Sequence, residues 1–191
     1  MNITAADVNK LRKQTGAGIM DCKKALEETQ GDFEAAIDFL RKKGAKVAAN
    51  RQDRDAKEGV VLSKTNAEQT LAVVISVNCE TDFVAKNQDF ISFAESIAHI
   101  ALQNKTNSIE ALKQSSFDEK LSVADKFMEQ VGKIGEKIDI GYLELVEGSR
   151  VASYIHPGNR LAVALGFNKT VNEEVYKNIR SEEHTSELQS H

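Results

Sequence analysis

The spacing of apolar residues changes along this chain, and that change restricts the possible folds more than any other feature of the sequence. As far as residue 44, apolar residues recur every three or four positions, which is typical of amphipathic helices. Short β-rich or alternating stretches occupy residues 59–77 and 138–167, and helical spacing returns between them. This order predicts an α+β fold, in which a small helical bundle precedes helices packed on a small antiparallel sheet.

Capping residues and glycines divide the first part of the chain into three short predicted helices. Thr4, with Asp7 three positions later, is close to a capping box, so the first helix is expected to begin there. Glycine often follows the last residue of a helix, and Gly16, Gly31 and Gly44 are therefore expected to end the three helices. One face of each helix carries the apolar residues expected in the core: Val8, Leu11, Cys22, Ala25, Leu26, Phe33, Ala36, Ile37 and Leu40.

Two hairpins are predicted in the rest of the chain. Residues 59–62 are expected to pair with residues 71–77, and residues 151–155 with residues 161–167, because polar turn residues separate each pair of β-rich runs. A period of two also begins after Gly135, and its expected inward-facing residues are Ile138, Ile140 and Tyr142.

Two longer helices are predicted between these hairpins. One is expected to begin near Gln88, and the other is expected to be capped near Ser115 or Ser116. Their apolar residues lie at helical spacing and are expected in the core: Phe90, Phe93, Ala94, Ile97 and Ala101 in the first, and Phe117, Leu121, Ala124, Met128 and Val131 in the second.

The predicted elements fall into five segments. They are residues 1–45 (a three-helix bundle), 46–58 (a charged linker), 59–137 (a first core subdomain), 138–179 (the start of a second core subdomain) and 180–191 (a tail). The Gly-Ala-Gly turn at Gly16–Gly18 makes the bundle resemble the ubiquitin-associated (UBA) type. A bundle this small is near the lower size limit for independent folding.

The tail resembles the translation of a common sequencing-library adapter. Residues 180–191 contain one leucine and no aromatic residue, so they are expected to be non-native and disordered. The natural protein is then expected to continue past Ile179, which would leave the second half of the core incomplete in this chain.

Composition favours a cytoplasmic protein with an ordinary core. The chain is 41% apolar, yet no apolar run approaches the ~20 residues that span a membrane. The first residues carry no secretory signal pattern. The two cysteines, Cys22 and Cys79, lie far apart, which is neither a metal-ligand spacing nor a disulfide framework and suits a reducing compartment.

Charge is divided unevenly within the formal net charge of −4, because the first 57 residues are net basic and the remainder is net acidic. The run Arg41–Lys43 and its basic neighbours could form an RNA-binding surface, but Phe33 and Phe39 lie at helical spacing and are expected in the core. A solvated basic helix or linker is therefore favoured, with an RNA-binding module as the weaker alternative. A steep salt dependence of RNA binding would support that alternative.

Few residues are arranged for catalysis. The Gly16–Gly18 turn lacks the third glycine and the preceding strand of a phosphate-binding loop. Cys79 and His156 could act as nucleophile and base, but Glu80 and Asp82 would raise the pKa of the thiol. We therefore expect no enzymatic activity, no cofactor and no metal site.

The segment Asn78–Asn87 (Asn-Cys-Glu-Thr-Asp-Phe-Val-Ala-Lys-Asn) is the strongest candidate for function. It joins a predicted strand to a predicted helix and places Asp82 beside Phe83 in a loop, where binding residues often lie. Phe83 could fold back on the local core, as large apolar residues usually do. The alternative is a protruding loop that enters another protein.

A second segment, Thr15–Leu26 (Thr-Gly-Ala-Gly-Ile-Met-Asp-Cys-Lys-Lys-Ala-Leu), favours the protruding loop. Together the two segments resemble the translation elongation factor Ts family, and the resemblance extends over about Ile3 to Ile179. It implies a guanine-nucleotide exchange factor that binds the GTPase domain of EF-Tu, in its GDP-bound and nucleotide-free states, and promotes GDP release. It implies no nucleic-acid or membrane partner and leaves open whether the intact protein is a homo-oligomer.

The resemblance also implies which residues contact EF-Tu. Asp82 and Phe83 match the loop that wedges beside the Mg²⁺ and nucleotide site of EF-Tu. Further contacts correspond to Arg12, Ile19, Met20 and Lys23 in the bundle and to Ile134 and His156 in the core. The runner-up function is a UBA-like adaptor without exchange activity, which would bind ubiquitin-like proteins but not EF-Tu.

Overall fold

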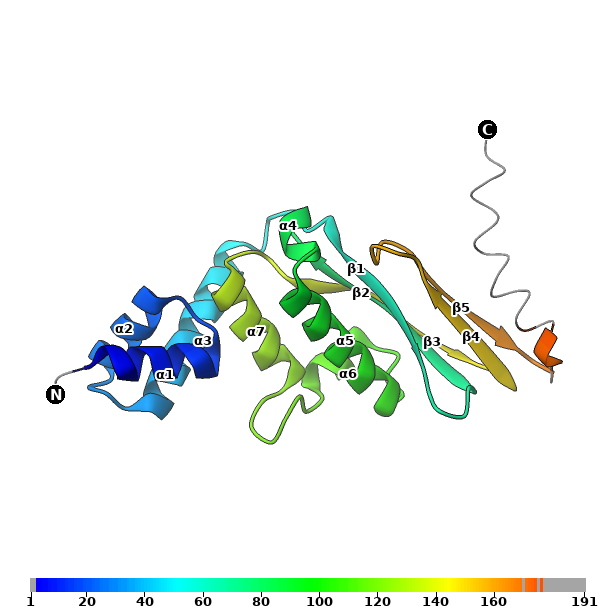
Figure 1. Cartoon of the computed structure of the whole chain (residues 1–191), viewed down its shortest axis with the longest axis horizontal. Helices are drawn as coiled ribbons and strands as arrows, with labels where there is room; N and C mark the ends of the chain where they lie inside the picture. Colours follow the sequence, from blue (N-terminus) through cyan, green and yellow to red (C-terminus); the bar gives the residue numbers. More distant parts are fainter. Residues whose placement is uncertain (1–2, 170, 175, 177–191) are drawn as a thin grey trace.

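The computed structural model describes residues 3–169, 171–174 and 176 (Figure 1). A helical bundle forms one end of the molecule, a helix-covered sheet the middle, and a β-hairpin the other end. The helices are α1 (Ala5–Thr15), α2 (Ile19–Glu28), α3 (Phe33–Asn50), α4 (Asp82–Ala85), α5 (Gln88–Gln103), α6 (Ile109–Gln114) and α7 (Val123–Ile134). The strands are β1 (Glu58–Thr65), β2 (Leu71–Cys79), β3 (Asp139–Glu147), β4 (Arg150–Ile155) and β5 (Ala162–Phe167). This arrangement is the expected α+β class.

The first helix follows its sequence signals. The Thr4 side chain accepts a hydrogen bond from the Asp7 N–H and the Asp7 carboxylate accepts one from the Thr4 N–H, which completes the capping box. Gly16 ends α1 in the left-handed region with φ 70°, where a side chain would be strained. The bundle core contains the fully buried residues Leu11, Cys22, Ala25, Leu26 and Ala36.

The prediction that Gly44 ends the third helix is wrong. Helix α3 continues through Gly44 to Asn50, so the first residues of the expected linker are helical. Gly44 is buried against α7, where a Cβ atom would lie 2.3 Å from the Met128 carbonyl oxygen. A Cβ atom on Gly132 of α7 would in turn lie 3.0 Å from the Gly44 Cα. Gly44 therefore permits a close crossing of two helix backbones.

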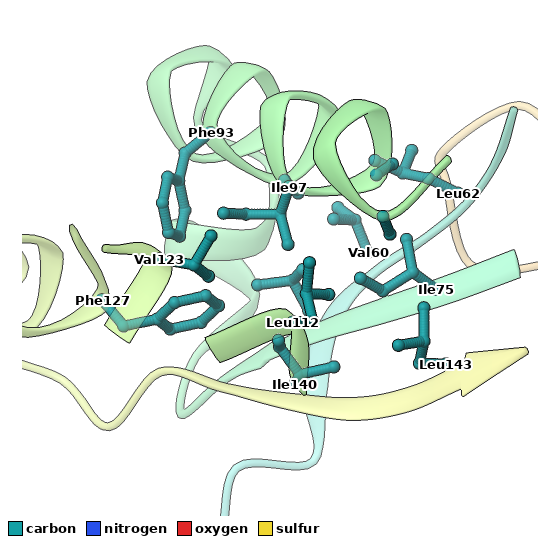
Figure 2. Packing of buried hydrophobic residues seen from close by; sticks show 14 of the residues in the cluster. Val60, Leu62, Ile75, Phe93, Ile97, Leu112, Val123, Phe127, Ile140 and Leu143 are labelled. Carbon is teal, nitrogen blue, oxygen red and sulfur yellow. The ribbon is translucent and has the colours of Figure 1, made fainter. Parts of the chain in front are cut away.

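The core is a three-stranded antiparallel sheet of order β1-β2-β3, covered by helices. Figure 2 shows the side chains between the layers: Phe93 and Ile97 of α5, Leu112 of α6, and Val123 and Phe127 of α7 point toward the strands. The rings of Phe93 and Phe127 meet edge to face with centroids 5.0 Å apart. The helix predicted near Gln88 and the β1–β2 hairpin are confirmed.

The second predicted helix begins later than expected. Ser122 and Asp125 form its capping box, so α7 starts at Val123, and the short helix α6 precedes it. Phe117 and Leu121 lie in the connecting loop, where the Phe117 N–H donates to the Leu121 carbonyl at 2.7 Å. Phe127 is buried in place of the expected Met128, which is exposed.

A β-bulge alters the predicted alternation in β3. Ile140 pairs with Val77 and Tyr142 pairs with Ser76, so Gly141 is an extra residue in the strand. Ile138 and Ile140 are buried as predicted, but Tyr142 is 51% exposed and Leu143 takes the inner position. An extra residue reverses the faces of the side chains that follow it.

Strand β3 pairs with β2 and completes the first sheet, whereas the sequence predicts its residues at the start of a second subdomain. The hairpin of β4 and β5 forms as predicted. Its turn is attached to β1, because the Val61 N–H donates to the Asn159 carbonyl at 2.7 Å. The tail at residues 180–191 lies outside the described residues. In the part of the chain that the structure describes, no helix is both long and apolar enough to cross a membrane.

The helix crossing predicts the sign of one stability change. At an open helix position, glycine to alanine stabilises by about 1 kcal/mol. Gly44→Ala should instead lower the free energy of unfolding by about 1–3 kcal/mol, because the new methyl group meets the α7 backbone. Urea unfolding measures the change. Lys46→Ala, at an exposed position of the same helix, is the control and should change stability little; a Gly44→Ala variant as stable as the parent would contradict the crossing.

The burial of the two cysteines predicts how the stability of the fold and the reactivity of the thiols depend on pH. Burial raises the pKa of Cys79 from 9.0 to about 11, and burial also raises the pKa of Cys22. The folded state therefore favours both protonated thiols. The stabilising contribution of Cys79 is complete below pH 9 and is lost as pH rises through about 11.

At pH 8 neither thiol should react with Ellman's reagent until the chain unfolds in urea, and the urea midpoint should fall between pH 9 and pH 11. An added exposed thiol, Lys24→Cys, should react in the native state and serves as the control. Fast native-state reaction of Cys79 would contradict its burial.

Candidate functional site

A short helical turn after β2 presents the most exposed large apolar side chain that the described residues contain. Thr81 is the N-cap of α4, and its hydroxyl accepts a hydrogen bond from the Val84 N–H at 3.5 Å. Phe83 lies in the first turn of α4 and is 83% exposed, whereas Ala85 is buried beneath it. We call residues 82–85 the tip. The alternative in which Phe83 folds back on the core is therefore wrong.

Asp82 places a negative charge beside the exposed ring. Lys86 donates a hydrogen bond to the Asp82 carboxylate at 2.7 Å, and this bond, with the Lys86 charge, lowers the pKa of Asp82. The carboxylate is therefore ionised at neutral pH. Its place in the first turn of α4 is also electrostatically favourable, because helix N-termini carry partial positive charge.

The base of the tip is held by a residue that sequence reasoning did not identify. One oxygen of Glu136 accepts hydrogen bonds from the Glu80 N–H at 3.1 Å and the Thr81 N–H at 3.0 Å. The other accepts a hydrogen bond from the Thr81 hydroxyl at 2.7 Å. The only local signal was an acid directly after Gly135, the left-handed cap of α7 with φ 79°.

The Glu80 carboxylate in turn binds the loop that follows α7. Its carboxylate accepts hydrogen bonds from the Lys137 N–H at 2.6 Å and from Arg51 at 2.6 Å. Burial opposes the charge on Glu80, but these two hydrogen bonds and the positive charges of Arg51 and Arg54 together outweigh burial and lower its pKa. Arg51 is the C-cap of α3, so this ion pair also attaches the end of α3 to the base of the tip.

The Cys79 thiol is not activated by a lowered pKa, as a nucleophile would be. The Cys79 thiol donates to the Thr81 carbonyl at 3.2 Å and has a raised pKa, so it is protonated at neutral pH. His156 Nδ1 lies 3.1 Å from the Tyr154 hydroxyl. In the described residues no group of three or more His, Cys, Asp and Glu could hold a metal ion.

His156 and Ile134 lie at the same end of the sheet as the tip. His156 is half-buried in the turn between β4 and β5, and the positive charge of Arg160 in that turn contributes to the lowered pKa of Asp82. Ile134 is half-buried against the core at the end of α7, two residues before Glu136. In Figure 1, α4, this turn and the end of α7 lie along the upper side of the view.

The four predicted bundle residues are all exposed, and three of them lie on α2. Ile19 and Met20 occupy the first turn of α2, and Met20 is 72% exposed. Arg12 is exposed near the end of α1, and Lys23 is exposed one turn further along α2, where it pairs with Glu27 at 3.7 Å. We call this group the bundle patch. Its exposed apolar residues, Ile19 and Met20, suit an apolar partner surface.

Comparison with known proteins agrees with these features. A family model described as "Elongation factor TS" matches residues 80–181, which include the tip, Ile134, Glu136 and His156. The elongation factor Ts of Christiangramia forsetii is 56% identical over 179 residues, and that of Flavobacterium psychrophilum is 51% identical over 179 residues. The protein of the same name from Porphyromonas gingivalis is 42% identical over 179 residues.

The aligned regions cover 93–94% of this chain but 64–65% of these relatives, so the chain spans less than two thirds of their length. The alignments extend over most of the bundle, the sheet and the hairpin, and the family model alone covers more than half of the chain. On this agreement the chain belongs to the elongation factor Ts family.

Proposed function

We propose that this chain is a guanine-nucleotide exchange factor that binds EF-Tu in the cytoplasm and promotes GDP release during polypeptide elongation. The observation that carries the proposal is the 83% exposure of Phe83 on a firmly held tip. Membership of the elongation factor Ts family supports EF-Tu as the partner.

Phe83 acts as the wedge. Burying a phenylalanine side chain contributes about 1.5–3 kcal/mol, so an exposed ring at a protruding position is a source of binding energy. Aromatic anchors that enter a pocket of a partner commonly dominate an interface. Inserted between two helices of EF-Tu beside the Mg²⁺ site, the ring displaces the elements that hold the metal and the phosphates.

The mechanism needs no catalytic chemistry in this chain. An exchange factor must bind nucleotide-free EF-Tu more tightly than the GDP complex, and linkage then requires factor and GDP to weaken each other by the same ratio. Displacing the EF-Tu elements beside the Mg²⁺ site by about one ångström is enough to weaken GDP binding, because packed elements shift between discrete arrangements. Ile134 and His156, at the same end of the sheet, add contacts around the wedge.

The bundle patch acts as the docking site. Ile19 and Met20 present exposed apolar side chains, with Arg12 and Lys23 nearby, so this surface contributes affinity. Helix α3 belongs both to the bundle and to the crossing with α7, and it therefore sets the position of the bundle patch relative to the tip. A UBA-like adaptor without exchange activity could use the same patch, and binding without GDP release would favour it.

The wedge predicts a large kinetic effect of one substitution. Phe83→Ala should reduce the rate of EF-Tu–GDP dissociation that the factor stimulates by roughly 30-fold, which corresponds to about 2 kcal/mol. Stopped-flow release of a fluorescent GDP analogue measures it. The fold should be unaffected, because the ring is mostly exposed. Tyr142→Ala, which removes an exposed ring from β3, is the matched control; equal loss in both variants, or none with Phe83→Ala, would reject the wedge.

The docking site predicts a different kinetic pattern. Met20→Asp should weaken the affinity for EF-Tu about tenfold while the GDP release rate at saturating factor stays near that of the parent, because the tip is unchanged. Calorimetric titration and the concentration dependence of release separate the two quantities. A point substitution is preferable to deletion of residues 1–50, since deletion would remove α3 from its contact with α7.

The matched control is Glu28→Gln at the other end of α2. Unchanged affinity of the Met20→Asp variant would show that the bundle patch does not contact EF-Tu.

A further inference from the structure

The loop before the tip and the loop after α7 exchange hydrogen bonds through two carboxylates. Glu136 accepts from the Glu80 N–H, the Thr81 N–H and the Thr81 hydroxyl at 3.1, 3.0 and 2.7 Å. Glu80 accepts from the Lys137 N–H at 2.6 Å. Both acids are partly buried, and hydrogen bonds to a carboxylate are roughly twice as strong as neutral ones. We call this arrangement the Glu136 clamp.

The clamp reaches the tip through Thr81. The Thr81 hydroxyl donates to Glu136 and also accepts from the Val84 N–H, so one side chain joins the clamp to the first turn of α4. Glu136 thereby fixes the side-chain rotamer of the N-cap. The direction of the backbone that enters α4, and with it the direction of Phe83, follows from that rotamer and from the two held N–H groups.

The tip needs this external support. Helix α4 spans Asp82–Ala85, four residues, and so short a helix is not stable by itself. The Phe83 ring is mostly exposed, so its own packing contributes little to its position. Ala85 belongs to the core and Val84 packs against it, so packing holds the end of the tip, while the bonds at its base support the turn that carries Phe83.

We propose that Glu136 is the positioning residue of the wedge. It orders the tip before binding, so that EF-Tu meets a preformed Phe83 and the entropy of ordering the loop is not lost during association. Glu136 acts through Thr81 and the backbone and does not itself need to touch EF-Tu. This inference rests on the proposed exchange function, but the effect of Glu136 on the order of the tip can be measured without EF-Tu.

The first measurement is made on the chain alone. Glu136→Ala should lower the ¹⁵N order parameters of residues 82–85 and speed amide hydrogen exchange at Thr81, while the sheet and α5 keep their values. Thr81→Val should have the same effect, because it removes the hydroxyl and keeps the shape, and Thr81→Ser should preserve the parent behaviour. Glu144→Ala, which removes an exposed acid of β3, is the matched control.

The second measurement is GDP release from EF-Tu. Glu136→Ala should reduce stimulated release about tenfold, from the loss of charge-assisted hydrogen bonds. Combined with Phe83→Ala, it should cause little further loss of stimulated GDP release, because without the Phe83 ring the position of the tip no longer affects release. A general weakening of the fold would instead reduce release by a similar factor with or without Phe83.

The outcomes separate the two proposals. Unchanged tip order parameters in the Glu136→Ala variant would overturn the positioning role, whatever EF-Tu does. A mobile tip with undiminished release, or additive losses in the double variant, would overturn the link from positioning to exchange. If Phe83→Ala itself has no effect, the exchange proposal fails, and the order parameters still decide whether Glu136 positions the tip.

Discussion

The position of the N-terminal bundle depends on one contact between two helix backbones. Gly44 of α3 and Gly132 of α7 approach so closely that a methyl group on Gly44 would enter the α7 backbone. A side chain at Gly44 would not fit at this separation, so the small size of glycine helps to specify where the helices cross. The crossing connects the bundle core to the larger core of the sheet, and the Arg51–Glu80 ion pair fixes the end of the same helix. The two cores thus act as one support for the exposed residues.

Local signals in the sequence were sufficient for much of the fold. The capping box at Thr4 and the left-handed cap at Gly16 depend on residues within a few positions of one another, and the β1–β2 hairpin is marked by the short polar turn between its strands. The errors arose where a distant segment decides the outcome. Gly44 continues a helix because α7 lies against it, and Tyr142 points outward because of a bulge in its pairing with β2. Neither effect has a local signature.

The candidate site likewise contains one residue that local sequence identifies and one that only a distant contact identifies. Phe83 could be selected from the sequence, because an aromatic residue in a strand-to-helix loop is conspicuous and the surrounding segment resembles a known family. Glu136 could not be selected, because it contacts Thr81, which is 55 positions away in the chain. A residue that presents a functional group can be recognised from its amino-acid type in the sequence, whereas the residue that supports it can be recognised only from its contacts in the structure.

Helix α3 also limits how this chain can change over evolutionary time. It runs without interruption from Phe33 in the bundle to Asn50, and Arg51, its C-cap, pairs with Glu80 at the base of the tip. One residue inserted before Gly44 would turn the bundle by about 100° around the helix axis and advance it about 1.5 Å. Every side chain would be retained, yet the bundle patch and the tip would face different directions. The number of residues in α3 is therefore as much a determinant of recognition as the identity of any residue at the surface, and insertions or deletions there should be rarer than substitutions.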